Sequence, residues 1–574
     1  MPLDRSALSS AIAHHHTIEH HHTIGAIEHH HTIEHHKTGD QGTMAKRRDE
    51  LAAYTFARKR TVAAFLAPSP GGSEEGAPRP VHTVMPSLAV GVVLVVGFIA
   101  WGVIRPTAPQ GWDTPGEYII VDSDSTTRYV VLDDKARSGK KTPTLHPVLN
   151  YASAKLLLDK GKGSVIEVPG KEIDKSGIPH GATLGIPYAP DRLPAADDAE
   201  KAKTWAVCER PAPGSDKAVD RAVFVLDAAD AKTLDNAGKV DAREALYVVD
   251  PKTSHEYLVD GKGHAFPLGD AAAADSTGME QLRAAVIGTT AQPQPVSQEW
   301  LHTLDQGGAI SFPTVPSAGQ PTTVQGLPAQ AQTVGRVLKA QDAQGAQYYV
   351  VLKDRVAAIT PFVASLLKSA PSAQLAYGTD EKTDIKADTA SIIAANGGQA
   401  DSFYADRGWP QTVPRQANSA ATGADAARNT ACSVYDGTMG ANRKPKLAAW
   451  AGATYPKKVI GDSLSAYVSS GSGLLFQEVT GTAQGGGATY LLTDTGLRYS
   501  LPANNDSTAG GATGSSASSS SSASGSEPTE TDKARTRLGY EKVSNPAIVP
   551  QSWAAFIPKG PTLDTGGAAQ PQSQ

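Results

Sequence analysis

The chain has 574 residues, a formal net charge of −5 and 6% aromatic residues, with 55 glycines and 39 prolines. The slightly acidic balance excludes a simple basic nucleic-acid binder, so no nucleic-acid partner is expected. So much glycine and proline predicts a loop-rich protein with several small cores instead of one large core.

The first 43 residues are a His-rich leader that holds eleven of the 17 histidines, in short repeats such as HHHTIEHH. Tracts of this kind bind zinc or nickel ions. We favour a different interpretation, in which the protein starts at Met44 and residues 1–43 are a disordered artefact without a function.

Residues 44–83 are predicted to form a cytoplasmic part, made of a basic amphipathic helix that ends near Leu66 and a linker rich in proline and glycine. Apolar residues recur near helical spacing from Leu51 to Leu66, and basic residues lie between them. Such a helix lies on the inner leaflet of a membrane or docks on a cytoplasmic partner protein. The predicted docking residues are Lys46, Arg47, Arg48, Arg58, Lys59 and Arg60.

The run VMPSLAVGVVLVVGFIAWGVI, from Val84 to Ile104, contains no charged residue. About twenty helical residues at 1.5 Å each cover a hydrocarbon core of roughly 30 Å, so we predict a transmembrane helix with these limits. The run begins too far into the chain for a cleavable signal, and it is expected to remain as an anchor in the lipid bilayer.

Basic residues are distributed unevenly around this run. Seven precede it between Lys46 and Arg79, whereas Arg105 is followed by none until Arg128. Lysine and arginine remain preferentially on the cytoplasmic side of a membrane. The sequence therefore predicts a single-pass protein of the inner (plasma) membrane, with a cytoplasmic N-terminus and an extracytoplasmic C-terminal domain.

The chain has two cysteines, Cys208 and Cys432, and both lie in the predicted exported part. Thiols outside the cytoplasm oxidise and persist as disulfides, so we predict a bridge between these two. Two separate buried thiols, packed as small hydrophobic side chains, are the alternative.

A unit recurs four times in residues 105–550, the predicted periplasmic repeat domain. Each copy has an aliphatic strand, a strand that opens with an aromatic residue, a turn rich in Asp and Gly, and a proline that leads into a helix or loop. The predicted strand pairs are Tyr118–Val121 with Tyr129–Leu132, Leu246–Val249 with Tyr257–Val259, Val334–Leu338 with Tyr348–Leu352, and Leu474–Val479 with Tyr490–Leu492. A hairpin with one short helix cannot bury its own apolar face, so these units are expected to pack on neighbours or on a shared central body.

A Ser-rich loop and the C-terminal tail are predicted to lack fixed structure. Residues 504–534 form a Ser-rich loop inserted in the repeat domain, with almost nothing to bury. Residues 551–574 form a C-terminal segment that ends in the flexible tail GGAAQPQSQ.

The motifs contain no catalytic constellation. The chain lacks a Walker A motif, and SGKKT at Ser138–Thr142 is out of register with one. The GDSLS stretch at Gly461–Ser465 is similar to the nucleophile block of GDSL esterases, but no histidine follows His302 to activate its serine. The six histidines outside the leader lack metal-ligand spacing. The sequence thus predicts no catalytic residue, metal site or cofactor, and it favours a non-catalytic protein over an enzyme.

Several stretches of the chain form a recognisable set. They are RRDELAAYTFARKRTVAAFL and SPGGSEEGAPRP before the apolar run, WGVIRPTAPQGW at its end, and LHPVLNYASAKLLL, LGIPYAPDRLP, TWAVCER, NTACSVYDG and FIPKGPTL beyond it. Together these stretches resemble the EccB family, the bitopic membrane subunit of actinobacterial type VII (ESX) secretion systems. The resemblance extends from Met44 to Leu563, and the block beside the apolar run is its most specific part.

This resemblance implies a fold of the α+β class, with a single transmembrane helix and an elongated periplasmic domain of β-rich repeats around a central β domain. It implies a disulfide that here joins Cys208 to Cys432. The implied partners are EccC, EccD, EccE and the mycosin protease of the membrane complex, together with self-association of the periplasmic domain. The His-rich leader and the Ser-rich loop depart from the family pattern.

The predicted function is that of a structural core component, which anchors and organises the periplasmic side of a type VII secretion channel. Two alternatives remain open. Some family members carry an ATPase label, so one alternative is a nucleotide hydrolase of the same system, although the missing Walker motif does not support it. The other is a cell-wall-binding membrane anchor, which would capture glycan without secretion subunits.

Overall fold

The computed structural model describes residues 47–66, 80–104, 108–135, 141–212, 218–269, 276–343, 345–396, 401–421, 428–440, 442–459, 465–481, 487–502 and 529–572. Internal contacts divide the chain into two units, Met1–Gly102 and Val103–Gln574. The predicted His-rich leader, Lys46, the linker after Leu66 and most of the Ser-rich stretch lie outside the described residues.

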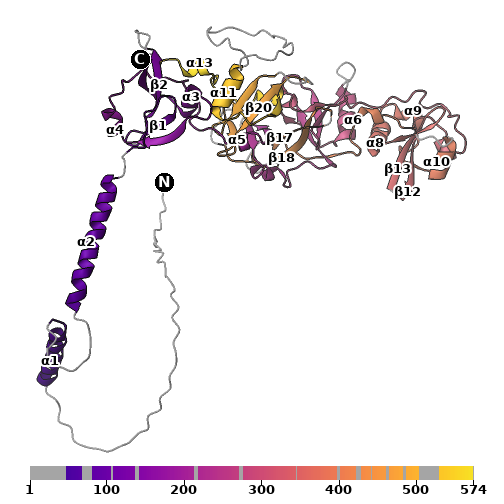
Figure 1. The fold of residues 1–574 in the computed structure, drawn as a ribbon. Helices are drawn as coiled ribbons and strands as arrows, with labels where there is room; N and C mark the ends of the chain where they lie inside the picture. Colours follow the sequence, from indigo (N-terminus) through magenta and orange to yellow (C-terminus); the bar gives the residue numbers. More distant parts are fainter. Residues whose placement is uncertain are drawn as a thin grey trace, which may run out of the picture. The chain divides into compact units, whose positions relative to one another are not determined.

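The predicted basic helix is present in the first unit as α1 (Arg47–Leu66) (Figure 1). Its division into an apolar and a basic face is weaker than predicted. At about 100° per residue, Arg58 projects within the arc of Leu51 and Tyr54, whereas Phe56 projects about 140° from Leu51. The large apolar side chains of α1 are exposed.

The apolar run forms the second helix, α2 (Pro80–Ile104), with Pro86 in its early turns. Its described side chains, from Met85 to Ile99, are exposed. Within the part of the chain that the structure describes, no helix combines the length and the apolar character needed to cross a membrane.

The described strands of the second unit form five sheets, and four of these sheets share one topology. In each, three antiparallel strands lead into a helix, and a fourth strand then pairs parallel with the first. The four predicted hairpins are confirmed as the first two strands of these sheets. The strand order is therefore third, second, first, fourth in every repeat.

The elements of the four repeats follow in chain order. Repeat 1 has β1 (Tyr118–Asp122), β2 (Arg128–Lys135), β3 (Lys141–Val148), α3 (Tyr151–Leu157) and β4 (Ser164–Val168). Repeat 2 has β7 (Glu244–Val249), β8 (Glu256–Asp260), β9 (His264–Pro267), α6 (Ser276–Val286) and β10 (Gln294–Pro295). Repeat 3 has β12 (Val337–Asp342), β13 (Gly345–Val351), β14 (Val356–Ile359), α8 (Pro361–Ser369) and β15 (Ile385–Lys386). Repeat 4 has β20 (Leu474–Val479), β21 (Thr489–Leu492), β22 (Arg498–Leu501), α11 (Glu530–Leu538) and β23 (Ala547–Pro550).

A further extended segment covers the outer edge of the third strand in every repeat. In repeat 2 this segment is β11 (Asp305–Gln306), which pairs parallel with β9. The equivalent parallel bridges join Leu145 to His180, Ala358 to Ser402 and Arg498 to Lys559. Covering an edge strand satisfies its backbone groups and prevents uncontrolled pairing with other chains.

Local sequence explains where the repeat helices begin. Asn150, Thr360 and Thr529 are N-caps whose side chains accept hydrogen bonds from backbone N–H groups in the first turn of α3, α8 and α11. Such caps satisfy donors that a helix leaves unpaired at its start. Pro361 follows its cap at the first helical position, where its missing N–H costs nothing.

The fifth sheet is the central one, with the order β18-β17-β5-β6-β19. Its strands come from two distant parts of the chain: β5 (Thr204–Pro211), β6 (Val219–Leu226), β17 (Thr430–Met439), β18 (Pro445–Gly452) and β19 (Ser465–Val468). The largest buried core joins this sheet to repeats 2 and 4, through side chains such as Trp205, Val259 and Phe476. The central sheet is therefore the hub of the second unit.

The repeats meet in two pairs through their equivalent helices. Helix α3 of repeat 1 contacts α11 of repeat 4, and α6 of repeat 2 contacts α8 of repeat 3 (Figure 1). Strands β23 and β10 contact β17 and β5 of the central sheet, so repeats 4 and 2 are the inner members of the two pairs.

The second unit also contains shorter elements. They are α4 (Gly170–Lys175), α5 (Ala196–Ala199), η1 (Asp230–Leu234), α7 (Gln298–Leu301), η2 (Ala329–Ala331), α9 (Ala373–Tyr377), α10 (Thr389–Ala395), η3 (Ala405–Arg407), β16 (Arg415–Gln416), α12 (Gln551–Ala554) and α13 (Thr565–Ala568).

Three sequence-based boundaries differ from the structure. Strand β12 begins at Val337 instead of Val334, because Gly335 adopts φ 96 and interrupts the extended backbone. The predicted Ser-rich loop ends before residue 534, because Thr529 caps α11 from Glu530 onward. The predicted flexible tail, GGAAQPQSQ at residues 566–574, is folded up to residue 572: Ala568 is fully buried, and Gln572 donates its backbone N–H to the Thr183 carbonyl.

Candidate functional site

The predicted disulfide is present and lies inside the central sheet. Cys208 on β5 and Cys432 on β17 are directly opposite each other in an antiparallel register and are fully buried. Their sulfurs are 2.03 Å apart, across a sequence separation of 224 residues. The bridge confirms the predicted pairing and rules out the alternative of two free thiols.

The described residues of the other motifs have structural roles. His146 contacts Asp134 and the Ala182 carbonyl, with both ring nitrogens engaged. Parts of SGKKT and GDSLS lie outside the described residues, and their last residues begin or enter strands β3 and β19. Among the described residues, no group of three or more His, Cys, Asp or Glu side chains is arranged to hold a metal ion.

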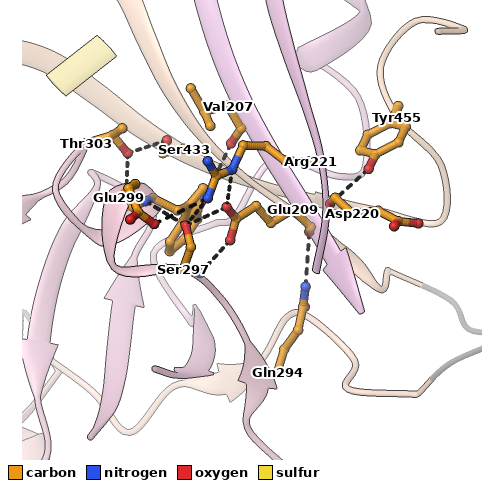
Figure 2. Close-up of polar contacts among 11 residues, drawn as sticks. Val207, Glu209, Asp220, Arg221, Gln294, Ser297, Glu299, Thr303, Ser433 and Tyr455 are labelled. Carbon is orange, nitrogen blue, oxygen red and sulfur yellow. Dashed lines mark hydrogen bonds and ion pairs between the residues drawn. The ribbon is translucent and has the colours of Figure 1, made fainter. Parts of the chain in front are cut away.

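A buried carboxylate that sequence reasoning missed lies where repeat 2 meets the central sheet (Figure 2). Glu209 on β5 has no exposed surface, and its cross-strand neighbour on β6 is Arg221. The Arg221 Nε donates to Glu209 Oε1 over 2.6 Å. A charged residue at the end of the apolar strand TWAVCERP was the only sequence signal for this pair.

Repeat 2 supplies the other donors to this carboxylate. The Ser297 backbone N–H donates to Glu209 Oε2, and the Ser297 hydroxyl donates to Oε1, each over 2.6 Å. Ser297 is also the N-cap of α7, where its Oγ accepts from the Trp300 N–H. A buried ion is tolerated only when such hydrogen bonds replace its hydration, so Glu209 fixes Ser297 against the sheet.

Neighbouring contacts extend this junction in three directions. The Trp300 indole N–H donates to the Val207 carbonyl at 2.9 Å, and the Gln294 amide donates to the Glu209 carbonyl at 3.2 Å. The Arg221 guanidinium lies 4.9 Å from the ring centre of Phe556, which follows α12. Arg221 thus contacts the central sheet, repeat 2 and the C-terminal segment together, and we refer to Glu209, Arg221 and Ser297 as the buried junction.

A second polar contact between repeat 2 and the central sheet is open to solvent. The His264 Nδ1 is 2.9 Å from Asp260, its Nε2 is 3.9 Å from Asp305, and Lys444 from the β17–β18 hairpin contacts Asp305 at 2.8 Å. The hydrogen bond to Asp260 raises the pKa of His264, against a smaller opposing effect of burial.

This raised pKa predicts a pH dependence of stability. A histidine near pKa 6.5 when unfolded gains its carboxylate partners on folding, so its stabilisation is complete below about pH 6.5 and is lost as the pH rises through the raised value. The effect should stay below about 1 kcal/mol, because the side chain is 38% exposed. Chemical denaturation between pH 5.5 and 8.5 measures this effect. We expect the free energy of unfolding to fall less with rising pH for His264→Gln than for the wild type. An equal fall in both proteins would contradict this role of His264.

The fold defines the class of protein: a mixed α+β protein whose four repeats of one topology attach in two pairs to a central, disulfide-bridged sheet. Residues 44–573 match the family described as "Type VII secretion system ESX-1, transport TM domain B". The chain therefore belongs to the EccB family of type VII secretion systems.

Curated relatives agree with this assignment. The chain is 28% identical over 511 residues to the "ESX-3 secretion system ATPase EccB3" of Mycolicibacterium smegmatis, which covers 85% of this chain and 84% of the relative. It is 31% identical over 302 residues to the "ESX-1 secretion system ATPase EccB1" of Mycobacterium tuberculosis, covering 50% of this chain and 55% of the relative. The chain thus matches about half the length of the ESX-1 relatives.

Solved structures share the fold. An "EccB3 dimer from the ESX-3 core complex" has a TM-score of 0.54 and 21% identity, over 79% of this chain and 99% of that one. A chain of an "intact ESX-5 inner membrane complex" has a TM-score of 0.53 and 20% identity, over 93% and 97%. These structures are similar in fold to the protein described above, including its multiple sheets.

Proposed function

We propose that this chain is a non-catalytic structural core component of a type VII protein secretion complex, which anchors and organises the extracytoplasmic side of the channel. The observation that carries the proposal is the fixed arrangement of the second unit. Two repeat pairs attach to one central sheet through an apolar core, a disulfide and the buried junction. Such an arrangement presents several surfaces to partners in set positions, as a scaffold requires.

The anchor that we propose is the apolar run Val84–Ile104. Its support is the uncharged sequence and the exposure of apolar side chains such as Leu88 and Phe98. A surface of this kind is stable in hydrocarbon. The excess of Lys and Arg before the run supports a cytoplasmic N-terminus and an extracytoplasmic second unit in the inner membrane.

Helix α1 is the proposed cytoplasmic docking element. Its exposed aromatic side chains, Tyr54, Phe56 and Phe65, accompany Arg47, Arg48, Arg58, Lys59 and Arg60. A surface with aromatic and arginine residues suits a protein interface. The partners that we propose are EccC, EccD, EccE and the mycosin protease, with self-association of the second unit; the "EccB3 dimer" of the related structure supports self-association.

Deleting residues 46–66 tests this role. We expect the shortened protein to remain in the membrane fraction, because the apolar run is intact, and to lose its secretion partners in detergent-solubilised pull-downs. A second variant tests the charges alone, because it keeps the aromatic side chains and changes Arg58, Lys59 and Arg60 to Gln. We expect this variant to co-purify less of the secretion partners. Normal recovery of the partners with the deletion variant would contradict the docking role.

A nucleotide hydrolase is the second candidate, because the curated relatives carry "ATPase" in their names. The purified full-length chain should show no ATP hydrolysis above that of a mock purification if the scaffold proposal is right. ATP hydrolysis that co-elutes with the chain, and that is lost when residues of the chain are substituted, would favour the enzyme instead.

A cell-wall anchor is the third candidate. Binding of purified glycan by the chain, without secretion subunits, would favour it.

A further inference from the structure

An open groove of about 560 Å³ lies where three modules of the second unit meet. One wall follows α7 and includes His302, the second is the β17–β18 hairpin, and the third is the end of β20 together with α12. Half-buried Met439 and Leu447 and buried Trp553 make its lining partly apolar. The volume is within the range of about 300 to 1,000 Å³ that is usual for ligand sites.

The charges along this groove are unbalanced. Its carboxylate, Asp305, is already paired with Lys444 at 2.8 Å and lies 3.9 Å from the His264 Nε2. Arg443 also lines the groove and is exposed, and it forms no ion pair with any residue that the structure describes. The groove therefore offers a guanidinium that carboxylates bind with paired hydrogen bonds.

The backbone of Arg443 adopts a conformation that non-glycine residues rarely have. The residue adopts φ 56, in the left-handed region, and its N–H closes the hairpin turn on the Gly440 carbonyl at 2.9 Å. A non-glycine residue there costs on the order of 1 kcal/mol, which glycine would avoid. Arg443 forms no ion pair within the described chain that would offset this cost, and residues in such conformations cluster at binding sites.

We propose that the groove binds an extended segment of a partner protein in which an acidic residue lies beside an apolar one. The carboxylate would pair with Arg443, and the apolar side chain would lie on Met439 and Leu447. The partly apolar lining favours a peptide over inorganic phosphate, which would leave that surface uncovered. The proposal rests on the scaffold role above and adds the chemistry of one partner.

A random hexapeptide library, probed with the full-length chain in detergent micelles, tests this proposal. We expect the selected peptides to be enriched in Asp or Glu next to Leu, Ile or Phe. With Arg443→Gln the acidic enrichment should disappear, and the affinity for a selected peptide should fall about tenfold, because a charged hydrogen-bond partner is lost. Lys446→Gln is the matched control, because this exposed hairpin lysine is not part of the groove lining. The peptides that this variant selects should show the same acidic enrichment as those of the wild type.

A second variant separates binding from stability. Arg443→Gly should lose the acidic preference while its thermal unfolding midpoint stays the same or rises, because glycine adopts φ 56 without strain. Three results would each overturn the proposal: no selected peptides, selection without acidic enrichment, or the same enrichment in Arg443→Gln. If the secretion partners still co-purify normally alongside such a result, the proposed peptide binding by the groove is refuted and the scaffold role is not affected.

Discussion

Replacing Arg221 by alanine is expected to lower the free energy of unfolding by about 3 kcal/mol or more. The reason is that Glu209, which has no exposed surface, would keep a buried charge without its ionic partner. Repeat 2 should loosen first, because the same carboxylate holds Ser297. Urea unfolding of the full-length protein, followed by tryptophan fluorescence, measures the change, and Trp300 reports on the junction through its hydrogen bond to Val207.

A double variant tests whether the uncompensated charge is the cause. In Arg221→Ala with Glu209→Gln, the neutral amide can accept from the Ser297 N–H and donate to the Ser297 hydroxyl, so we expect this protein to be more stable than Arg221→Ala alone. Arg210→Ala is the control on the same strand pair. Arg210 is 39% exposed and meets Asp220 at 3.4 Å, and its loss should cost less than about 1 kcal/mol. A double variant less stable than the single one would refute the explanation.

Removing the disulfide is expected to cost about 2 to 5 kcal/mol under oxidising conditions. The bridge from Cys208 to Cys432 closes a loop with a sequence separation of 224 residues, and in the chain-entropy model so long a loop gives a large effect. It also joins β5 and β17, which belong to distant parts of the chain but are neighbours in the central sheet. Thermal unfolding of Cys208→Ser against the wild type measures the loss.

The two single variants and the double variant provide the control. Cys208→Ser, Cys432→Ser and the double serine variant should unfold at similar temperatures, because each removes the same covalent bond. The difference from the wild type should also shrink when reductant is present during unfolding. Equal midpoints of the wild type and Cys208→Ser in oxidising buffer would mean that the bridge does not stabilise the folded domain.

The local parts of the repeats were predictable because their signals are local. The hairpins of Tyr129, Tyr257, Tyr348 and Tyr490 join strands that are near each other in the chain, so an aliphatic strand followed by a strand that opens with an aromatic residue was enough to recognise each pair. The proline that leads into a helix or loop is likewise a local signal, and in repeat 3 it is Pro361, the first residue of α8. Helix α1 shows the limit of this approach. The helical spacing from Leu51 to Leu66 predicted separate apolar and basic faces, but Arg58 projects on the apolar side and Phe56 projects away from it.

The fourth strands of repeats 2 and 3 were not predictable. Strand β15 has only Ile385–Lys386, and β10 has only Gln294–Pro295, so neither carries a periodic pattern. Each pairs parallel with a strand that lies across an intervening helix. Such a strand is extended because a sheet edge is available to it, which is a property of the folded neighbours and not of its own residues.

The sequence by itself determined the apolar run, the location of both cysteines in the predicted exported part, the four hairpins and the resemblance to the EccB family. Only the tertiary structure decided that the repeats pair through equivalent helices, that strands near residues 205 and 432 form one sheet, and that Glu209, Arg221 and Ser297 meet in its interior. The physical reason is the distance along the chain over which each interaction acts. Helical and hairpin periodicity acts between near neighbours in the chain, whereas burial and charge pairing act between any residues that folding brings within a few ångströms.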